Sequence, residues 1–197
     1  MTLVYLAVAA PLVASFVGLL GGRLVPRLVV PVAVAGTGVS LLAALVMAAR
    51  AVTTDGLVER ASLDTVPLGG GLSFGLDLRL DGLAALVSVA VTVVALMVQV
   101  YSTAYLKGDP RYSSYAALVS LFTAAMLLVV FADDLFVLLV GWEVMGVCSY
   151  FLIGHHWEQE GSRAGAVKAF VTTRLGDVGF LFGIFTIGQV FGTFSID

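Results

Sequence analysis

The chain alternates long apolar stretches with short polar connections, and the lengths of these stretches predict its architecture. Six of them approach or exceed the roughly 20 residues that an α-helix needs to cross a hydrocarbon core of about 30 Å. They occupy residues 3–22, 28–49, 82–106, 112–132, 134–156 and 164–191. Little sequence is left for a soluble domain, so the pattern predicts an all-α polytopic membrane protein with about six transmembrane helices.

The connection at residues 50–81 has a pattern of its own. Apolar and polar residues alternate on both sides of Gly69-Gly70-Gly71. Alternation with a period of two around a glycine cluster is typical of a β-hairpin. An irregular loop is the alternative.

Composition agrees with the membrane assignment, because 60% of the residues are hydrophobic and only 12% are charged, against about 25% charged residues in soluble domains. No basic segment precedes the first stretch and no small-residue cleavage site follows it, so we expect a retained span and not a signal peptide. The single cysteine, Cys148, leaves no disulfide framework or thiolate cluster within this chain. No basic tract is available for nucleic acid.

Basic residues fall on alternate connections and predict an orientation. They are Arg23 and Arg27, Lys107 and Arg111, and Arg163 and Lys168. Because basic connections tend to stay in the cytoplasm, we expect the N-terminus and the 50–81 hairpin on the outer face. The hairpin segment carries three arginines of its own, but five acidic residues offset them.

Glu143 is the only charged residue between Leu135 and Trp157. A helix that starts near Asp134 places it roughly 14 Å into the membrane, near the midplane. Ionisable groups at that depth are costly and usually mark an ion or proton path. Its own helix offers no cation three or four residues away, so its partner must be another helix, water or a proton. A carboxyl group that hydrogen-bonds a neighbouring helix is the structural alternative.

Three further ionisable residues interrupt the sixth stretch. Arg174 and Asp177 are three residues apart, so they share a helical face and can pair. A neutral structural ion pair is one reading, and support of a proton path is the other. Lys168 lies near the predicted cytoplasmic end, where its ammonium group can also reach the lipid headgroups.

Several uncharged polar residues are weaker candidates. Tyr150 follows Glu143 by seven residues and shares its face, so its hydroxyl can extend a proton relay, although tyrosine is also common at membrane interfaces. Gln99, Thr172 and Thr173 are buried polar candidates that can each hydrogen-bond their own helix instead.

The ends of the fifth stretch carry polar pairs without a predicted chemical role. His155 and His156 are adjacent, and consecutive helical residues point about 100° apart, so we expect an interfacial position and no metal site. Asp133 and Asp134 precede the helix, where a carboxylate caps the N-terminus. No phosphate loop, nucleophile elbow or dinucleotide fingerprint is present.

Taken together, these residues closely resemble the antiporter-like L subunit of respiratory NADH:quinone oxidoreductase (complex I), which is called chain 5 in mitochondria. The resemblance covers essentially the whole chain, and its motifs are long and in the right order. They are 74–88 (FGLDLRLDGLAALVS), 101–106 (YSTAYL), 132–136 (ADDLF), 141–143 (GWE), 148–154 (CSYFLIG) and 168–177 (KAFVTTRLGD).

The resemblance implies a proton-translocating membrane-arm subunit in a bacterial inner membrane, coupled to quinone reduction elsewhere in the complex. Glu143 would match the family's intramembrane glutamate, and Arg174 and Asp177 would match positions in its sixth helix. The 50–81 hairpin would match the outer-face hairpin that links neighbouring subunits. The expected partners are other membrane-arm subunits, above all the adjacent antiporter-like one. FMN, iron–sulfur clusters and quinone are expected in other subunits, and no cofactor or metal in this chain.

Two departures from the family pattern stand out. Val144-Met145-Gly146 replaces the usual Gly-Val-Gly after the glutamate. Family members also have many more helices, arranged as inverted five-helix repeats, with a lysine in the seventh helix that pairs with the glutamate. This chain resembles their N-terminal third: two accessory helices (1–49), the hairpin (50–81), a third helix with its cytoplasmic loop (82–111), and the start of the first repeat (112–197).

Two other functions remain open. The large subunit of a multi-subunit Na⁺/H⁺ antiporter shares the fold and the intramembrane glutamate, although the GWE and CSY motifs are closer to complex I. A membrane scaffold that transports nothing is the alternative from a different class. In a scaffold, substitution of Glu143, Arg174 or Asp177 would lower assembly and not ion flux.

Overall fold

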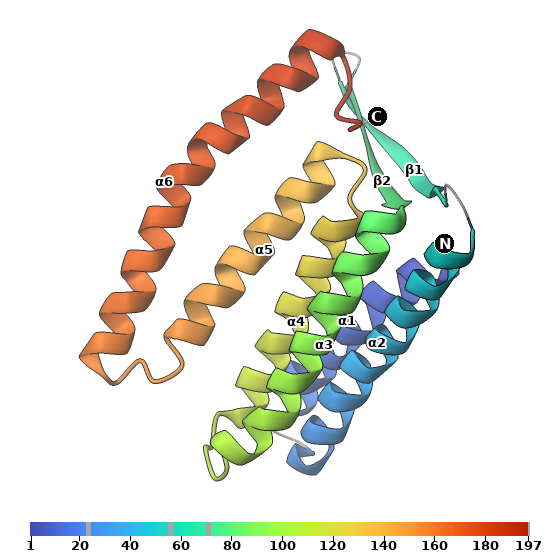
Figure 1. Cartoon of the computed structure of the whole chain (residues 1–197). Coiled ribbons are helices and arrows are strands. Elements are labelled where there is room, and N and C mark those ends of the chain that lie inside the picture. The colour runs from blue at the N-terminus through green and yellow to red at the C-terminus, as the bar shows by residue number, and fades with distance from the viewer. Residues whose placement is uncertain (23–24, 55–56, 70–71, 197) are drawn as a thin grey trace.

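The computed structural model describes residues 1–22, 25–54, 57–69 and 72–196. Six long helices and one hairpin follow each other along the chain (Figure 1). They are α1 (Thr2–Gly21), the short 3₁₀ helix η1 (Pro26–Leu28), α2 (Val29–Thr53), β1 (Glu59–Gly69), β2 (Leu72–Leu80), α3 (Gly82–Tyr105), α4 (Tyr112–Phe131), α5 (Leu135–Ile153) and α6 (Glu160–Phe191). Within the described ranges, all six α-helices are long and apolar enough to span a membrane.

The helices α1 to α4 form a bundle, and α5 and α6 extend it on one side (Figure 1). Small side chains allow the close packing, since a Cβ atom added at Gly18 of α1 would lie 2.9 Å from Ala117 Cβ of α4. The helix α5 packs on α4, and α6 packs on α5. Most of α6 is exposed apart from Ala166, Ile184 and Gly188. The all-α membrane fold that the sequence predicts is confirmed.

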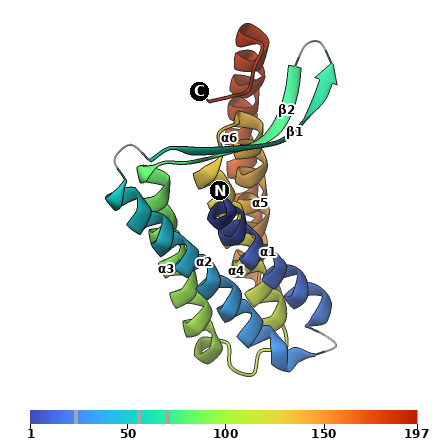
Figure 2. The ribbon, with the colours of Figure 1, turned by 90° about the vertical axis from the view of Figure 1, so that its right-hand side faces the viewer.

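The two strands pair antiparallel, with Glu59 opposite Leu80 and Leu63 opposite Leu76, and the register shifts between Leu63 and Val66. The hairpin at 50–81 is therefore confirmed over the irregular loop. It crosses one end of the bundle, at the end where the C-terminus also lies (Figures 1 and 2). The predicted turn residues Gly70 and Gly71 lie outside the described residues.

The connection between α4 and α5 joins the hairpin to the C-terminal segment. The Asp133 N–H donates to Asp77 O at 2.9 Å, and the Leu135 N–H donates to Phe194 O at 2.8 Å. Asp134 caps α5 as predicted, since its Oδ1 accepts from the Phe136 and Val137 N–H groups at 2.7 and 3.2 Å.

Capping was the wrong explanation for Asp133. Its carboxylate lies 3.5 Å from Arg60 Nε and 3.9 Å from Arg79 Nη1, so it anchors the hairpin by charge. Neither arginine is near Asp133 in the sequence, and only the folded hairpin brings both to this carboxylate.

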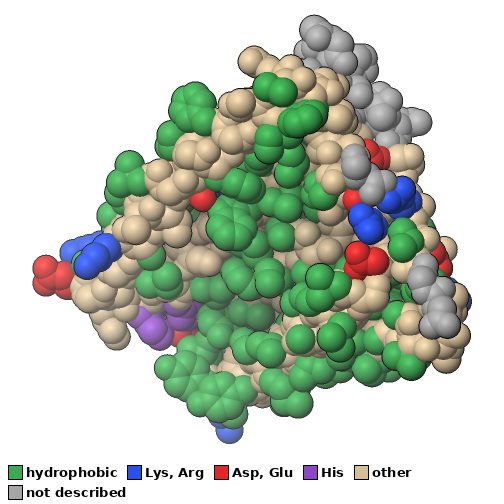
Figure 3. All heavy atoms as spheres, turned by 45° about the horizontal axis from the view of Figure 1, so that its top comes forward, with side chains coloured by type: hydrophobic (Ala, Val, Ile, Leu, Met, Phe, Trp, Pro, Cys, Tyr) green, Lys and Arg blue, Asp and Glu red, His purple; other side chains and the backbone are tan. Residues whose placement is uncertain are grey.

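The alternation of the helices places the connections that follow α1, α3 and α5 together at the end opposite the hairpin (Figure 1). Arg27, Lys107, Arg111 and Arg163 are therefore at one end, as their alternation in the sequence predicts, and Arg23 lies outside the described residues. Charged side chains gather mainly near the edges of the face in Figure 3, and apolar ones cover its middle. Which end faces the cytoplasm stays a prediction.

Candidate functional site

Glu143 is the ninth of the 19 residues of α5, about 12 Å along the helix from Leu135. Its Oε2 forms an ion pair with Arg174 Nη1 of α6. Arg174 Nη2 also donates to the Glu143 carbonyl oxygen at 3.4 Å. The partner of Glu143 therefore comes from another helix, which is one of the three sources that its sequence position allowed.

Arg174 serves a second carboxylate on its own helix. Its Nη1 lies 3.5 Å from Asp177 Oδ2, so the predicted pair at i and i+3 is present. The indole Nε1–H of Trp142 donates to the other oxygen, Asp177 Oδ1, at 2.8 Å. One guanidinium thus contacts two carboxylates. The helix α5 contacts Arg174 through Glu143 and Asp177 through Trp142.

Two residues next to the Arg174 guanidinium, one on each helix, allow it to reach α5. A Cβ atom at Gly146, one turn after Glu143, would lie 3.1 Å from Arg174 Nη2. The Phe170 ring lies under the guanidinium, with 4.9 Å from Arg174 Cζ to the ring centroid. A cation over an aromatic face gains about 0.5–1 kcal/mol at an exposed site. Glycine gives access, and the aromatic ring holds the cation in place.

Tyr150 does not continue this polar group. Its ring packs against the same Phe170, 5.3 Å between ring centroids, and against Phe151 at 5.2 Å. The Phe170 ring therefore lies in contact with both the Tyr150 ring and the Arg174 guanidinium, so an apolar ring links the two residues. A relay role for Tyr150 stays a prediction.

Lys168, Thr172 and Thr173 are exposed on α6. The two threonines hydrogen-bond their own helix, Thr172 Oγ1 to Lys168 O at 2.8 Å and Thr173 Oγ1 to Phe170 O at 2.9 Å. This is the simple alternative that the sequence left open for them. Lys168 lies about 1.7 turns before Arg174, and a supporting role for its charge stays a prediction.

For Gln99 that same alternative is wrong. The side chain is fully buried, and its Nε2 donates across the bundle to Ala116 O and Ser120 Oγ of α4, both at 3.0 Å. Gln99 therefore connects two helices. Its distance along the sequence from α4 hid this contact.

A hollow of about 570 Å³ lies on the α1 and α4 side of Glu143. Its wall includes Glu143, Ser114 near the start of α4 and Leu19 near the end of α1, and its other lining residues are apolar apart from Cys148. Because α1 ends and α4 starts at the end of the bundle opposite the hairpin, the hollow extends from Glu143 toward that end.

His155 and His156 differ from expectation. Both follow the last residue of α5, Ile153, so they are not consecutive helical residues. Their Nε2 atoms lie 3.1 and 3.9 Å from the same oxygen, Asp109 Oδ2. The assumption that helical geometry separates their side chains was wrong.

Two contacts of these polar groups were missed by the sequence reasoning. The sequence marks Trp142 only as part of the GWE motif, although its indole N–H is a donor that needs an acceptor inside a membrane. Asp109 was not singled out, and the turn signal Gly-Asp-Pro at residues 108–110 is the only hint of its position.

Comparison with known proteins places the chain among antiporter-like membrane subunits. Residues 67–116 match the family model "NADH-Ubiquinone oxidoreductase (complex I), chain 5 N-terminus". Residues 132–197 match the model "NADH:quinone oxidoreductase/Mrp antiporter, TM". The two matches together include the hairpin's second strand, α3, α5 and α6.

Curated relatives carry the same description. NADH-quinone oxidoreductase subunit L of Pseudomonas aeruginosa is 40% identical over 127 residues, which are 64% of this chain and 21% of that protein. Subunit L of Mycobacterium tuberculosis is 34% identical over 198 residues, 97% of this chain and 30% of that protein. The chain thus spans between a fifth and a third of the length of these two relatives.

Solved structures show the same fold. The Mrp complex from Dietzia sp. DQ12-45-1b superposes with a TM-score of 0.80 and 28% identity, over 99% of this chain and 20% of that chain. An archaeal membrane-bound sulfane sulfur reductase superposes with a TM-score of 0.84 and 21% identity, over 99% and 39% of the two chains. The chain belongs to the family of antiporter-like membrane subunits that includes the L subunit of NADH:quinone oxidoreductase.

Proposed function

We propose that this chain is part of a proton-translocating membrane-arm subunit of an NADH:quinone oxidoreductase in a bacterial inner membrane. In this proposal Glu143 carries the proton, and Arg174 decides whether Glu143 is charged. The observation that carries it is the ion pair between a mid-helix carboxylate of α5 and a cation of α6.

The electrostatics of the site support a proton-carrying role. A carboxylate in the middle of a membrane helix is stable as an anion only beside a cation, and without one it binds a proton. Arg174 has a second partner 3.5 Å away, Asp177, which Trp142 holds by a hydrogen bond. A small movement of the guanidinium toward Asp177 would leave Glu143 without its cation. Glu143 would then take up a proton, and release it when Arg174 returns.

The hollow beside Glu143 supports an access route. Its apolar wall extends from the α5 turn that holds Glu143 toward Ser114, at the end where the basic connections lie. With this end in the cytoplasm, as the basic residues predict, protons would reach Glu143 from the cytoplasmic side. Tyr150 and Lys168 would act as supporting groups between Glu143 and that end.

The cofactors of the complex and its other subunits would lie outside this chain. We propose that FMN, the iron–sulfur clusters and quinone are bound by other subunits, because an iron–sulfur cluster takes several cysteine thiolates and this chain has one cysteine. The lipid bilayer and the adjacent antiporter-like subunit would be its neighbours. The lysine of the seventh helix, which the resemblance implies, would follow residue 197.

The test is Glu143→Gln in the whole complex, reconstituted in liposomes. Gln keeps the size of the side chain and removes the proton site. We expect proton flux per NADH oxidised to fall while the complex still assembles. The control is Glu160→Gln, because Glu160 is an exposed carboxylate at the start of α6. Wild-type flux in Glu143→Gln would refute the proposal, and loss of assembly with normal flux per assembled complex would favour the scaffold.

A second function is favoured by the matches that name Mrp, the family model over residues 132–197 and the Dietzia complex. In that case the chain is part of the large subunit of a Na⁺/H⁺ antiporter and uses the same Glu143. The discriminating measurement is ion exchange without NADH. A sodium gradient that drives proton movement through Glu143, in the absence of any electron donor, would replace the first proposal by this one.

A further inference from the structure

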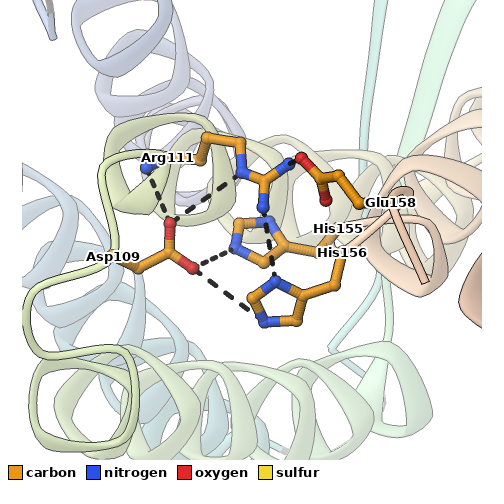
Figure 4. A network of polar contacts seen from close by, with 5 residues as sticks. All are labelled: Asp109, Arg111, His155, His156 and Glu158. Atoms are coloured by element: carbon orange, nitrogen blue, oxygen red, sulfur yellow. Dashed lines mark hydrogen bonds and ion pairs between the residues drawn. The ribbon is translucent and has the colours of Figure 1, made fainter.

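Two connections meet at the end of the bundle opposite the hairpin, and three potential metal ligands converge there (Figure 4). Asp109 lies between α3 and α4, and His155 and His156 lie between α5 and α6. Asp109 Oδ2 is 3.1 Å from His155 Nε2 and 3.9 Å from His156 Nε2, and the three ligand atoms lie within 4.8 Å of one another. These are the only histidines of the chain.

The backbone of both connections fixes this arrangement. Gly108 has φ of +88°, a conformation that side chains disfavour, and it turns the chain so that Asp109 faces α5. The Arg111 N–H donates to Asp109 Oδ1 at 2.7 Å, which leaves Oδ2 directed at the histidines. After α5, the Gln159 N–H closes a turn on His156 O at 2.9 Å. The ligands are therefore held by the backbone before any ion arrives.

Burial and charge suit a cation. The Asp109 and His155 side chains are each only 10% exposed, whereas His156 is 43% exposed and opens the site to water. Arg111 Nη1 is 2.6 Å from Glu158 Oε1. Counting Asp109, Arg111 and Glu158 with neutral histidines, the group has a net charge of −1.

We propose that Asp109, His155 and His156 bind a divalent transition metal of the Zn²⁺ class that joins the α3–α4 connection to the α5–α6 connection. Two imidazoles and a carboxylate are a usual ligand set for Zn²⁺. Bonds of about 2.0–2.1 Å in a tetrahedron place ligand atoms roughly 3.4 Å apart. The two separations from Asp109, 3.1 and 3.9 Å, are on either side of that value, and the two imidazole nitrogens lie within 4.8 Å of each other, so small side-chain rotations that bring the rings together would complete the site. Water takes the fourth position, on the open side of His156.

Arg111 competes with the metal for His156. Its Nη2 lies 3.4 Å from His156 Nδ1, where the ring nitrogen accepts a hydrogen bond. A metal on Nε2 of a neutral imidazole requires the proton on Nδ1, so the guanidinium must turn fully to Glu158, which it already contacts. Arg111→Met removes this competition and keeps the backbone N–H, and we expect it to bind the metal more tightly than the wild type.

The test uses the full-length protein purified from its native membrane and stripped with a chelator. Zn²⁺ is added back, bound zinc is counted, and zinc X-ray absorption identifies the ligand atoms. We expect one ion with two imidazole nitrogens at about 2.0–2.1 Å. His155→Gln, His156→Gln and Asp109→Asn should each weaken binding by at least about tenfold. The matched control Glu160→Gln removes a nearby exposed carboxylate and should change affinity less than twofold.

Two results would overturn the proposal. The first is zinc stoichiometry that does not fall in the double variant His155→Gln/His156→Gln, which would mean an adventitious ion elsewhere. The second is an X-ray absorption spectrum of the wild-type protein that shows bound zinc without imidazole ligands. This result does not depend on whether any variant folds. A bound ion should also raise the midpoint of thermal unfolding in the wild type, because binding to the folded state alone adds about 2.7 kcal/mol at a hundredfold excess over Kd. The double variant should lose that increase.

Discussion

Gln99 is a fully buried amide in the last third of α3, and its replacement separates two sources of stability. Its Nε2 makes two hydrogen bonds to α4, to Ala116 O and Ser120 Oγ. Its Oε1 is buried and has no hydrogen-bond partner among the described residues. Gln99→Leu removes both the bonds and the unsatisfied oxygen, whereas Gln99→Ala also removes the volume.

The magnitudes predict opposite results for the two variants. Hydrogen bonds between membrane helices average roughly 0.6 kcal/mol, so two are worth about 1.2 kcal/mol. Removal of a buried oxygen without a partner returns about 1–3 kcal/mol. Ser120 keeps its own bond to Ala116 O at 3.0 Å. We therefore expect Gln99→Leu to be neutral or up to about 2 kcal/mol more stable than the wild type, and Gln99→Ala to lose about 2–5 kcal/mol through the cavity.

The assay is the free energy of unfolding in detergent micelles from a denaturant titration. Thr92→Val is the matched control, because Thr92 is equally buried in α3 and bonds only its own helix, to Ser88 O at 2.7 Å and Val89 O at 3.1 Å. A loss of more than about 2 kcal/mol in Gln99→Leu, close to that of Gln99→Ala, would refute the reasoning. Lower proton flux at unchanged stability would instead place Gln99 in a proton path.

Three other substitutions test the caps and close contacts, each by the free energy of unfolding. Asp134→Ala should lose about 1 kcal/mol of the α5 cap, whereas Asp134→Asn keeps it. Burial raises the pKa of Asp134, although hydrogen bonds from the Phe136 and Val137 N–H groups oppose the shift. The free energy of unfolding therefore falls as pH rises through the folded pKa and Asp134 becomes charged. The advantage of Asn over Asp should shrink on acidification toward about pH 4. Gly141→Leu should cost about 1–3 kcal/mol or more, because a Cβ there would lie 2.6 Å from Val129 Cγ2 of α4. Gly192→Ala should cost about 1 kcal/mol at φ of +70°.

The helices and the hairpin could be predicted because their signals are local. Apolar runs of 20 residues and alternation around glycines specify an element without reference to the rest of the chain. The shift in strand register between Leu63 and Val66 could not be predicted, because it depends on how the two strands twist over the bundle end. The Asp133 contacts with Arg60 and Arg79 escaped for a similar reason, since they join segments more than 50 residues apart.

The residues of the site and the contact within one helix could be predicted, but the contacts between helices could not. Charge isolation identified Glu143, and helical spacing paired Arg174 with Asp177. A single sequence gives the polar face of each helix, but it does not give the rotation of one helix against another. That rotation decides whether Arg174 reaches Glu143 or points to the lipid, and Gly146 permits the contact only because it faces α6.

The charge count of the site indicates what a second cation would add to the proposed role of Arg174. Glu143 and Asp177 share one guanidinium, so the group carries one negative charge more than it can neutralise. At the 3.5 Å between Arg174 and Asp177 and an effective dielectric of 20, one such attraction is worth roughly 5 kcal/mol before desolvation, so Asp177 is a substantial competitor for the guanidinium. The Trp142 N–H donates to Asp177, whereas the Glu143 carboxylate pairs with Arg174. In the proposed mechanism, a second cation near Glu143, such as the lysine that the resemblance implies, would add to the effect of Arg174. Either the returning Arg174 or the arriving lysine would then displace the proton from Glu143.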